Sequence, residues 1–324
     1  MVRDDNNGQG HNKRNGMTFQ KAIITGANGF VGKYLVQHLQ EQGIRVIATD
    51  IQDCNSSEAD EYRQADITKA DELSRLMADV QPDLIFHLAG FSSVSRSYEN
   101  PELTYAINVG GTRNLLDAVR KHSPSARVIL VSSAEVYAAK GTPIAETDPL
   151  VTESSPYTLS RLQQEALLSD FQDLDIVISR SFNHIGPGQV EVFVASSFAR
   201  QIAEITVGKR DPVISVGNLE AIRDFTDVRD MVRAYLLLAD KGLRGERYNL
   251  GSGQGRSIRE LLDELIAASG QIIEVQIDQS RFRPSDNPYL VCDAAKFTAL
   301  TGYSASIPLA RTLSDMLEYW RNRS

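Results

Sequence analysis

The sequence has few cysteines, no long apolar run and no excess of positive charge. Only Cys54 and Cys292 occur among 324 residues, far apart and outside any Cys-x-x-Cys pattern. This excludes a disulfide framework and a zinc ribbon, and it favours a reducing cytoplasm. The apolar runs fall well short of the roughly 20 residues that span a bilayer, and the N-terminus lacks the apolar core of a signal peptide. We therefore expect a cytoplasmic protein without a membrane partner.

The charge balance is acidic. The chain carries 34 Lys and Arg against 42 Asp and Glu, a formal net charge of −8. This balance disfavours nucleic acid as a partner. The five histidines are scattered without metal-ligand spacing, so no metal site is predicted. With 42% hydrophobic residues, the chain can bury the core of one large domain or two ordinary ones.

Short apolar runs alternate with helical patterns along most of the chain. Residues 1–18 are polar and rich in Gly and Asn, and we expect a disordered leader there. The apolar runs that follow lie at 22–26, 44–50, 84–90, 127–133 and 175–181. Such runs separated by helices are typical of a parallel sheet covered on both faces. We predict an α/β fold, a Rossmann-type doubly wound parallel sheet with a smaller C-terminal α/β domain, in which a Ser257-x-x-Glu260 capping box begins a helix.

A glycine-rich segment, TGANGFVG (25–32), joins the first expected strand to a helix. Its glycines leave out side chains where the backbone approaches a pyrophosphate and where the helix packs on the strand. Amide groups and the helix dipole at such a position bind anions. A tight turn without any ligand is the alternative explanation of the glycines alone. The segment predicts dinucleotide contacts from Gly26, Asn28, Gly29, Phe30, Val31 and Gly32.

Asp50 ends the second expected strand, where a carboxylate accepts hydrogen bonds from the adenosine ribose hydroxyls. Its charge would repel a 2′-phosphate, and residues 49–54 contain no Arg or Lys to replace it. This favours NAD(H), with NADP(H) as the alternative cofactor; a solvated carboxylate at a strand end is the alternative without any ligand. Further contacts beside the adenine and along the cofactor are expected from Asp66, Ile67, Leu88, Ala89 and Gly90.

A hydroxyl, a phenol and a cation are expected to meet at the carboxyl ends of the strands. Ser133 ends one strand, and Tyr157 and Arg161 stand one turn apart at the start of a later helix. A phenol, with a reference pKa of about 10, needs a nearby cation for acid–base work at neutral pH. An ordinary surface tyrosine and arginine are the alternative interpretation of this pair.

From Lys21 onward, these motifs together resemble the extended short-chain dehydrogenase/reductase family, also described as the NAD-dependent epimerase/dehydratase family. The resemblance implies that Ser133 binds the substrate oxygen and that Tyr157 exchanges the proton. The basic residue would hold the nicotinamide ribose. The family has Lys where this chain has Arg161, and a guanidinium differs from an ammonium group in reach and hydrogen-bond geometry. Slower chemistry, an altered pocket or a non-catalytic nucleotide-binding protein would each explain this departure.

Three later segments resemble the nucleotide-sugar branch of this family, and most closely its GDP-4-keto-6-deoxy-D-mannose reductases. They are FNHIGPGQ (182–189), RDFTDVRD (223–230) and RFRPSD (281–286). The resemblance implies a GDP-linked 4-keto-6-deoxy sugar as substrate, with its pyrophosphate held by Arg223 and Arg283. Asn183 would contact the sugar or a phosphate, and Arg200 would approach the base or the phosphates. Each arginine by itself is also compatible with an ordinary surface charge.

The resemblance also implies a division into domains and an assembly. Residues 19–182 and about 213–247 would bind NAD(P), and about 183–212 with 248–324 would bind the nucleotide sugar. Helices near 101–122 and 156–172 would form a four-helix bundle in a homodimer.

The expected activity is reduction of the C4 ketone by NAD(P)H, giving GDP-D-rhamnose or its C4 epimer. A 4-epimerase or a 4,6-dehydratase that retains its NAD is the alternative, because in the related dehydratases a Glu at the position of Glu135 removes a sugar proton. However, Ala134 stands where many dehydratases have an Asp acid, and Glu135 would then only orient its neighbours.

Overall fold

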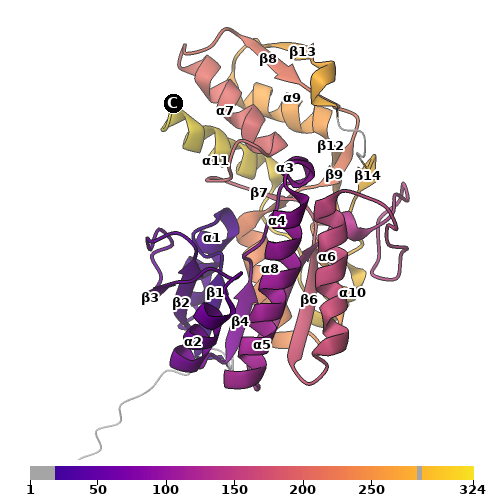
Figure 1. The fold of residues 1–324 in the computed structure, drawn as a ribbon. Coiled ribbons are helices and arrows are strands. Elements are labelled where there is room, and N and C mark those ends of the chain that lie inside the picture. Colours follow the sequence, from indigo (N-terminus) through magenta and orange to yellow (C-terminus); the bar gives the residue numbers. More distant parts are fainter. Residues whose placement is uncertain (1–18, 283–286) are drawn as a thin grey trace, which may run out of the picture.

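A seven-stranded parallel sheet forms the larger part of the molecule (Figure 1). The computed structural model describes residues 19–282 and 287–324. In the sheet the strand order is β11-β6-β5-β4-β1-β2-β3, and every neighbouring pair is parallel. Helices alternate with the strands along the chain. The predicted doubly wound α/β fold is therefore confirmed.

The elements of this larger part follow the apolar runs of the sequence closely. Its strands are β1 (Lys21–Thr25), β2 (Arg45–Asp50), β3 (Glu61–Gln64), β4 (Leu84–His87), β5 (Arg127–Ser133), β6 (Asp175–Ser181) and β11 (Arg247–Leu250). Its helices are α1 (Phe30–Glu41), α2 (Ala70–Val80), α3 (Val94–Glu99), α4 (Pro101–Tyr105), α5 (Thr112–His122), α6 (Pro156–Ala166), α8 (Val228–Lys241) and α10 (Ala295–Thr301). A π-helical segment (Ala106–Gly111) joins α4 to α5, and short 3₁₀ turns lie at Ala134–Val136, Leu167–Asp170 and Gln279–Arg281.

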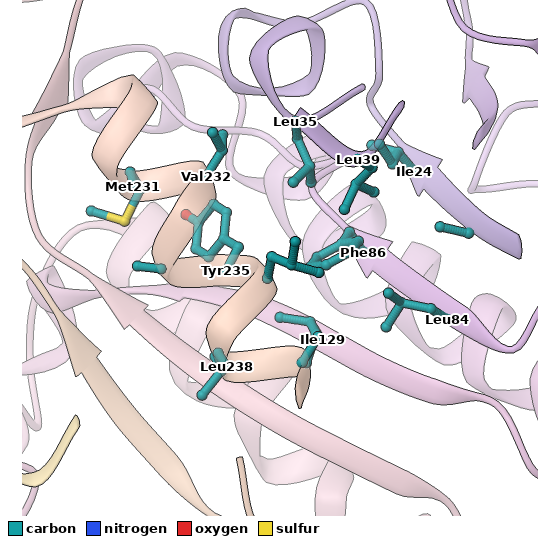
Figure 2. Packing of buried hydrophobic residues seen from close by; sticks show 14 of the residues in the cluster. Ile24, Leu35, Leu39, Leu84, Phe86, Ile129, Met231, Val232, Tyr235 and Leu238 are labelled. Carbon is teal, nitrogen blue, oxygen red and sulfur yellow. The ribbon is translucent and has the colours of Figure 1, made fainter. Parts of the chain in front are cut away.

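Apolar side chains cover both faces of the large sheet. Successive residues of a strand point to opposite faces, so Ile23 and Ile24 of β1 belong to two different core clusters. On one face Ile24 packs with Leu35 of α1 and Tyr235 of α8 (Figure 2). On the other face Ile23 belongs to the cluster that contains Leu115 of α5. Each such fully buried side chain contributes about 1.5–3 kcal/mol, and this packing fixes the strand ends that carry the site.

A smaller lobe lies beyond one end of the sheet, at the top of Figure 1. Its strand pairs are β8 (Val213–Val216) with β13 (Glu274–Ile277), and β7 (His184–Ile185) with β10 (Thr226–Asp227). A three-stranded sheet contains β12 (Gly255–Ser257), β9 (Ile222–Asp224) and β14 (Tyr289–Leu290). Its helices α7 (Val194–Thr206), α9 (Ile258–Ser269) and α11 (Leu309–Arg321) pack on one another. The predicted capping box at Ser257 and Glu260 begins α9 and is confirmed.

The pairing of the later strands differs from the expected division of the chain. The division placed 213–247 with the sheet, but β8 and β9 in this range pair with strands of the smaller lobe. Conversely, β11 joins β6 at the edge of the large sheet, and Phe297 of α10 packs on Tyr248 of β11. Hydrophobic patterning in strands of three or four residues does not specify which sheet they join. In the described part of the chain, every helix is too short or too polar to span a bilayer.

Candidate active site

A cleft of about 620 Å³ opens at the carboxyl ends of β1, β2, β4, β5 and β6. Parallel α/β sheets bind ligands at this edge. The residues predicted to touch a cofactor all line it: Gly26, Asn28, Gly29, Phe30, Val31, Gly32, Asp50, Asp66, Ile67, Leu88, Ala89, Gly90, Tyr157 and Arg161. Ser133, Glu135 and Asn183 line the same cleft. Side chains that are far apart in the sequence thus share one cavity.

The glycine-rich turn has the backbone geometry that a pyrophosphate site needs. Gly26 has φ +70°, and a Cβ atom there would lie 2.7 Å from the Ala89 nitrogen. A Cβ atom on Gly32 would lie 2.5 Å from the Ala27 carbonyl oxygen, so α1 can approach the turn only with glycine at this position. No side chain caps the start of α1 after Gly29. Its first amide groups therefore suit an anion, and the residues present fit a dinucleotide.

Asp50 stands at the end of β2, beside this turn. Its Oδ2 accepts a hydrogen bond from the Asn28 backbone nitrogen at 3.1 Å. The side-chain amide of Asn28 in turn donates to the Cys54 carbonyl oxygen at 2.7 Å. These contacts hold the carboxylate at the edge of the cleft, where ribose hydroxyls would meet it.

Hydrogen bonds at the end of β5 and at the start of α6 fix the positions of Ser133 and Tyr157. Ser133 ends β5, and its Oγ accepts from the Glu135 nitrogen at 3.2 Å. The Ser155 hydroxyl caps α6 by accepting from the Thr158 nitrogen at 3.1 Å, and Pro156 occupies the first helical position. This start puts Tyr157 in the first turn of α6. Tyr157 is 8% exposed, so most of its side chain is shielded from solvent.

Arg161 follows one turn later with its guanidinium held among neutral acceptors. Its Nη1 donates to the Val131 carbonyl oxygen at 3.2 Å and to Gln164 Oε1 at 2.9 Å. Its Cζ lies 5.3 Å from the centroid of the Tyr157 ring. A cation at this distance from an aromatic ring is attracted to the face of the ring. The arginine therefore occupies the place where the family resemblance implies a cation.

Two buried carbonyl oxygens in the cleft lack a hydrogen-bond partner. One is Asn183 Oδ1; the other is Oε1 of Gln189, whose Nε2 donates to the His184 carbonyl oxygen at 3.0 Å. Buried polar atoms are normally paired, so both suit a hydroxyl or amide donor of a ligand. Gln189 was not predicted, although the GPGQ segment contains it, because a glutamine alone signals no role.

Ser181 and Tyr235 also line the cleft and were not predicted. They share a hydrogen bond of 2.9 Å between their hydroxyls. Both lie within apolar strand and helix patterns, which indicate packing and give no sign of a polar contact.

Among the described residues, the predicted substrate arginines Arg200 and Arg223 do not line the cleft. Arg223 on β9 is buried, and its Nη1 donates to the Ile222 carbonyl oxygen at 3.0 Å. Arg200 on α7 lies 3.7 Å from Glu204. Arg283 lies outside the described residues. The assignment of these three arginines to a substrate stays a prediction.

Comparisons with known proteins agree on one family. The family model described as GDP-mannose 4,6 dehydratase matches residues 23–316. The chain is 33% identical over 311 residues to the GDP-6-deoxy-D-mannose reductase of Pseudomonas aeruginosa, covering 94% of this chain and 98% of that protein. It is 30% identical over 319 residues to a UDP-glucose 4-epimerase of Mycolicibacterium smegmatis, covering 94% and 99%. The solved structure of RMD from P. aeruginosa complexed with NADPH superposes with a TM-score of 0.81 at 31% identity, covering 94% and 100%.

Proposed function

The chain belongs to the GDP-mannose 4,6 dehydratase family, within the extended short-chain dehydrogenases/reductases, and from this premise we propose that it reduces the C4 ketone of GDP-4-keto-6-deoxy-D-mannose. The observation that carries the proposal is that Tyr157, Arg161 and Ser133 share one cleft with the glycine-rich turn. The full-length similarity to a GDP-6-deoxy-D-mannose reductase supports the substrate. The product is GDP-D-rhamnose or its C4 epimer.

The residues of the cleft supply an acid, a donor and a cation. A bound reduced nicotinamide would supply the hydride for the ketone carbon. The Ser133 hydroxyl donates a hydrogen bond to the ketone oxygen and polarises it. The Tyr157 hydroxyl gives its proton to the same oxygen as negative charge develops there. Arg161 stabilises the phenolate that remains, because its charge lies beside the ring.

We further propose NAD(H) as the preferred cofactor. The Asp50 carboxylate lies in the cleft and would repel a 2′-phosphate. The related structure from P. aeruginosa is complexed with NADPH, so the test compares the two nucleotides side by side. Titration of the protein with NADH and NADPH, followed by cofactor fluorescence, measures the ratio of the two dissociation constants directly.

For the sugar nucleotide we propose Asn183, Arg200, Arg223 and Arg283 as binding residues. The unpartnered Oδ1 of Asn183 supports its assignment. The assignment of the three arginines rests on the family resemblance and on the suitability of a guanidinium for binding a pyrophosphate. If they bind substrate, Arg223→Ala should raise the KM for the nucleotide sugar more than the dissociation constant of NADH.

We propose that two copies assemble through the face formed by α4, α5 and α6; α5 continues from α4, and α6 runs beside them in Figure 1. Leu103 of α4 is 49% exposed, and Tyr98 of the preceding helix is 55% exposed. A second copy packed on this face would bury both side chains. Cys54 and Cys292 are unpaired, which agrees with the proposed reducing cytoplasm.

A 4-epimerase or 4,6-dehydratase is the second candidate, favoured by the position of Glu135 in the cleft and by the epimerase relatives. Such an enzyme returns its cofactor to the starting oxidation state in each turnover. It would therefore be purified with NAD bound and would act without added reductant. The proposed reductase consumes one reduced cofactor for each ketone.

A panel of GDP-, UDP-, dTDP- and CDP-linked keto-sugars, each incubated with NADH or NADPH and analysed by mass spectrometry, tests the proposal. We expect reduction of the GDP-linked 4-keto-6-deoxy sugar with stoichiometric cofactor oxidation. Tyr157→Phe should lose about 10²- to 10⁴-fold in kcat. Tyr319→Phe is the matched control, because Tyr319 lies on α11 and does not line the cleft. An unchanged keto-sugar alongside an active control reductase would overturn the proposal.

A further inference from the structure

A chain of buried hydrogen bonds runs from Arg161 into the core. Gln164 Nε2 donates to the Thr112 hydroxyl at 2.9 Å, next to the bond between Gln164 Oε1 and Arg161. The Thr112 hydroxyl lies 2.9 Å from His87 Nε2, and His87 Nδ1 lies 2.7 Å from the Thr25 hydroxyl. Gln164, Thr112, Thr25 and His87 are at most 1% exposed. These hydrogen bonds thus link α6, α5, β4 and β1, and they end at Thr25, the first residue of the glycine-rich segment.

Chemistry fixes which end of the Gln164 carboxamide faces the arginine. A guanidinium has donors and no acceptor, so the carboxamide oxygen must face Arg161 and the nitrogen must face Thr112. The Thr112 hydroxyl donates to the Asn108 carbonyl oxygen at 2.7 Å and is therefore free to accept from Gln164. A reversed carboxamide would set two donors against each other at Arg161. Gln164 consequently has one orientation.

The directions of the hydrogen bonds at the other end of this network, around His87, are fixed in the same way. The Thr112 hydroxyl gives its proton to the Asn108 carbonyl oxygen, so His87 Nε2 must carry a proton and donate it to Thr112. His87 Nδ1 then accepts from the Thr25 hydroxyl, which itself accepts from the Ala89 nitrogen at 3.2 Å. Burial, aided by the nearby Arg161 charge, lowers the pKa of His87 to about 3. The imidazole stays neutral near neutral pH, so the donor and the acceptor of each hydrogen bond in the network stay the same.

We propose that Gln164 is a positioning residue that holds the guanidinium of Arg161 beside Tyr157. The proposal rests on the proposed function, in which Tyr157 is the acid. Gly90 bounds the same guanidinium on another side, since a Cβ atom there would lie 2.7 Å from Nη2 of Arg161. The planar guanidinium thus lies between the backbone of Gly90 and the side-chain carbonyl oxygen of Gln164. A compact ammonium group has no plane to orient, so this arrangement serves an arginine specifically.

The expected consequence is catalytic, because small displacements of a catalytic group are costly. A shift of about 1 Å in such a group can cost 10²-fold in rate. Gln164→Leu keeps the volume and removes the acceptor, leaving the Val131 carbonyl oxygen for Nη1. We expect kcat to fall about 10- to 100-fold while the KM for the keto-sugar changes little. The dissociation constant of NADH should rise about tenfold, because the resemblance implies that Arg161 also holds the cofactor ribose.

A double-mutant cycle separates positioning from simple packing. The variants are Gln164→Leu, Arg161→Lys and the double variant, each measured for kcat, NADH affinity and thermal unfolding. If Gln164 acts through the guanidinium, its loss adds nothing once Arg161 is lysine, so the effects are non-additive. Gln201→Leu is the matched control, because Gln201 is also a buried helical glutamine, but its amide donates to Ser197 on its own helix and not to the network around Arg161. Additive losses, or equal losses in the control, would overturn the proposal.

A charge variant supplies a second, independent readout. Gln164→Glu keeps the acceptor oxygen and places a negative charge beside the guanidinium, which offsets its stabilisation of the phenolate. We expect the alkaline limb of the pH profile of kcat/KM to move to higher pH, and an unmoved limb would contradict the proposal. In the double-mutant cycle, NADH affinity is measured on the protein without any sugar. These affinities therefore decide the role of Gln164 even if the wild-type protein leaves the keto-sugar unchanged. That last result would contradict only the proposed function.

Discussion

At the scale of single residues, the site depends on side chains whose partners limit their orientation. Arg161 shows this most clearly: it departs from the lysine of the family, yet its Nη1 has two acceptors and its charge faces the Tyr157 ring. Its Nη2 also lies close to the backbone of Gly90, where a Cβ atom would come within 2.7 Å. These contacts favour a working cation, so Arg161→Lys should lower turnover.

Asp50 should govern the choice between the two nicotinamide cofactors. Asp50→Asn removes the negative charge and keeps the size of the side chain. We expect the dissociation constant of NADH to rise about tenfold, because a hydrogen bond to a charged group is lost, and that of NADPH to rise less or to fall. Fluorescence titration of both cofactors measures this change. Asp53→Asn is the control, since Asp53 is exposed and outside the cleft lining, and an unchanged ratio in Asp50→Asn would exclude the carboxylate as the determinant.

His87 should make folding stability depend on pH. Its pKa is lowered to about 3 in the folded protein from an ordinary 6.5, so the unfolded chain takes up a proton first as the pH falls. Its contribution is fully present above pH 6.5 and is lost as the pH falls from there toward 3, by up to about 1.4 kcal/mol per pH unit. Denaturant unfolding of wild type and His87→Gln at several pH values should show a shallower slope for the variant. Parallel slopes would contradict this role.

At the scale of elements, the sequence predicts the large sheet well and the smaller lobe poorly. β5 and β6 have the predicted bounds, because long apolar runs leave little choice of structure. The expected helical stretch at 101–122 has these bounds, but a π-helical segment joins α4 to α5 within it. In that segment the Asn108 side chain bonds Phe91 and Ser160, and no periodicity encodes such tertiary contacts.

The junction of the glycine-rich turn and α1 should tolerate no side chain at Gly32. A Cβ atom there would meet the Ala27 carbonyl oxygen at 2.5 Å, and backbone cannot give way as a flexible side chain can. We expect Gly32→Ala to cost about 1–3 kcal/mol of stability and to weaken NADH binding. Gly110→Ala is the control, because nothing lies within 4 Å of a Cβ atom at that position. Equal unfolding midpoints in the two variants would refute the close approach.

At the scale of the whole molecule, the site unites segments that only the fold brings together. The sequence motifs correctly place residues at strand ends and helix starts, since parallel strands share one carboxyl edge. They do not place Gln189 and Tyr235, which reach the cleft through packing of the smaller lobe and α8. Nor does the net charge of −8 describe the cleft, where Arg161 contributes a buried positive charge.

The proposed dimer predicts a specific dissociation. Leu103→Glu places a charge in the face of α4, α5 and α6, and burial of an unpaired charge opposes association. Sedimentation at micromolar concentration should show a dimer for wild type and a monomer for Leu103→Glu. Ile272→Glu is the control, because Ile272 is 96% exposed in the smaller lobe and should leave the dimer intact. A monomeric wild type would count against this interface.

The central claim is that this cleft carries out a net reduction at the C4 carbon of a GDP-linked keto-sugar. The most direct measurement incubates the protein with GDP-4-keto-6-deoxy-D-mannose and a reduced cofactor deuterated at the transferred position, followed by mass spectrometry and NMR of the sugar. The proposed reductase predicts one deuterium at C4 of every product molecule and one oxidised cofactor released for each. A product without deuterium, formed while the added cofactor stays reduced, would contradict it.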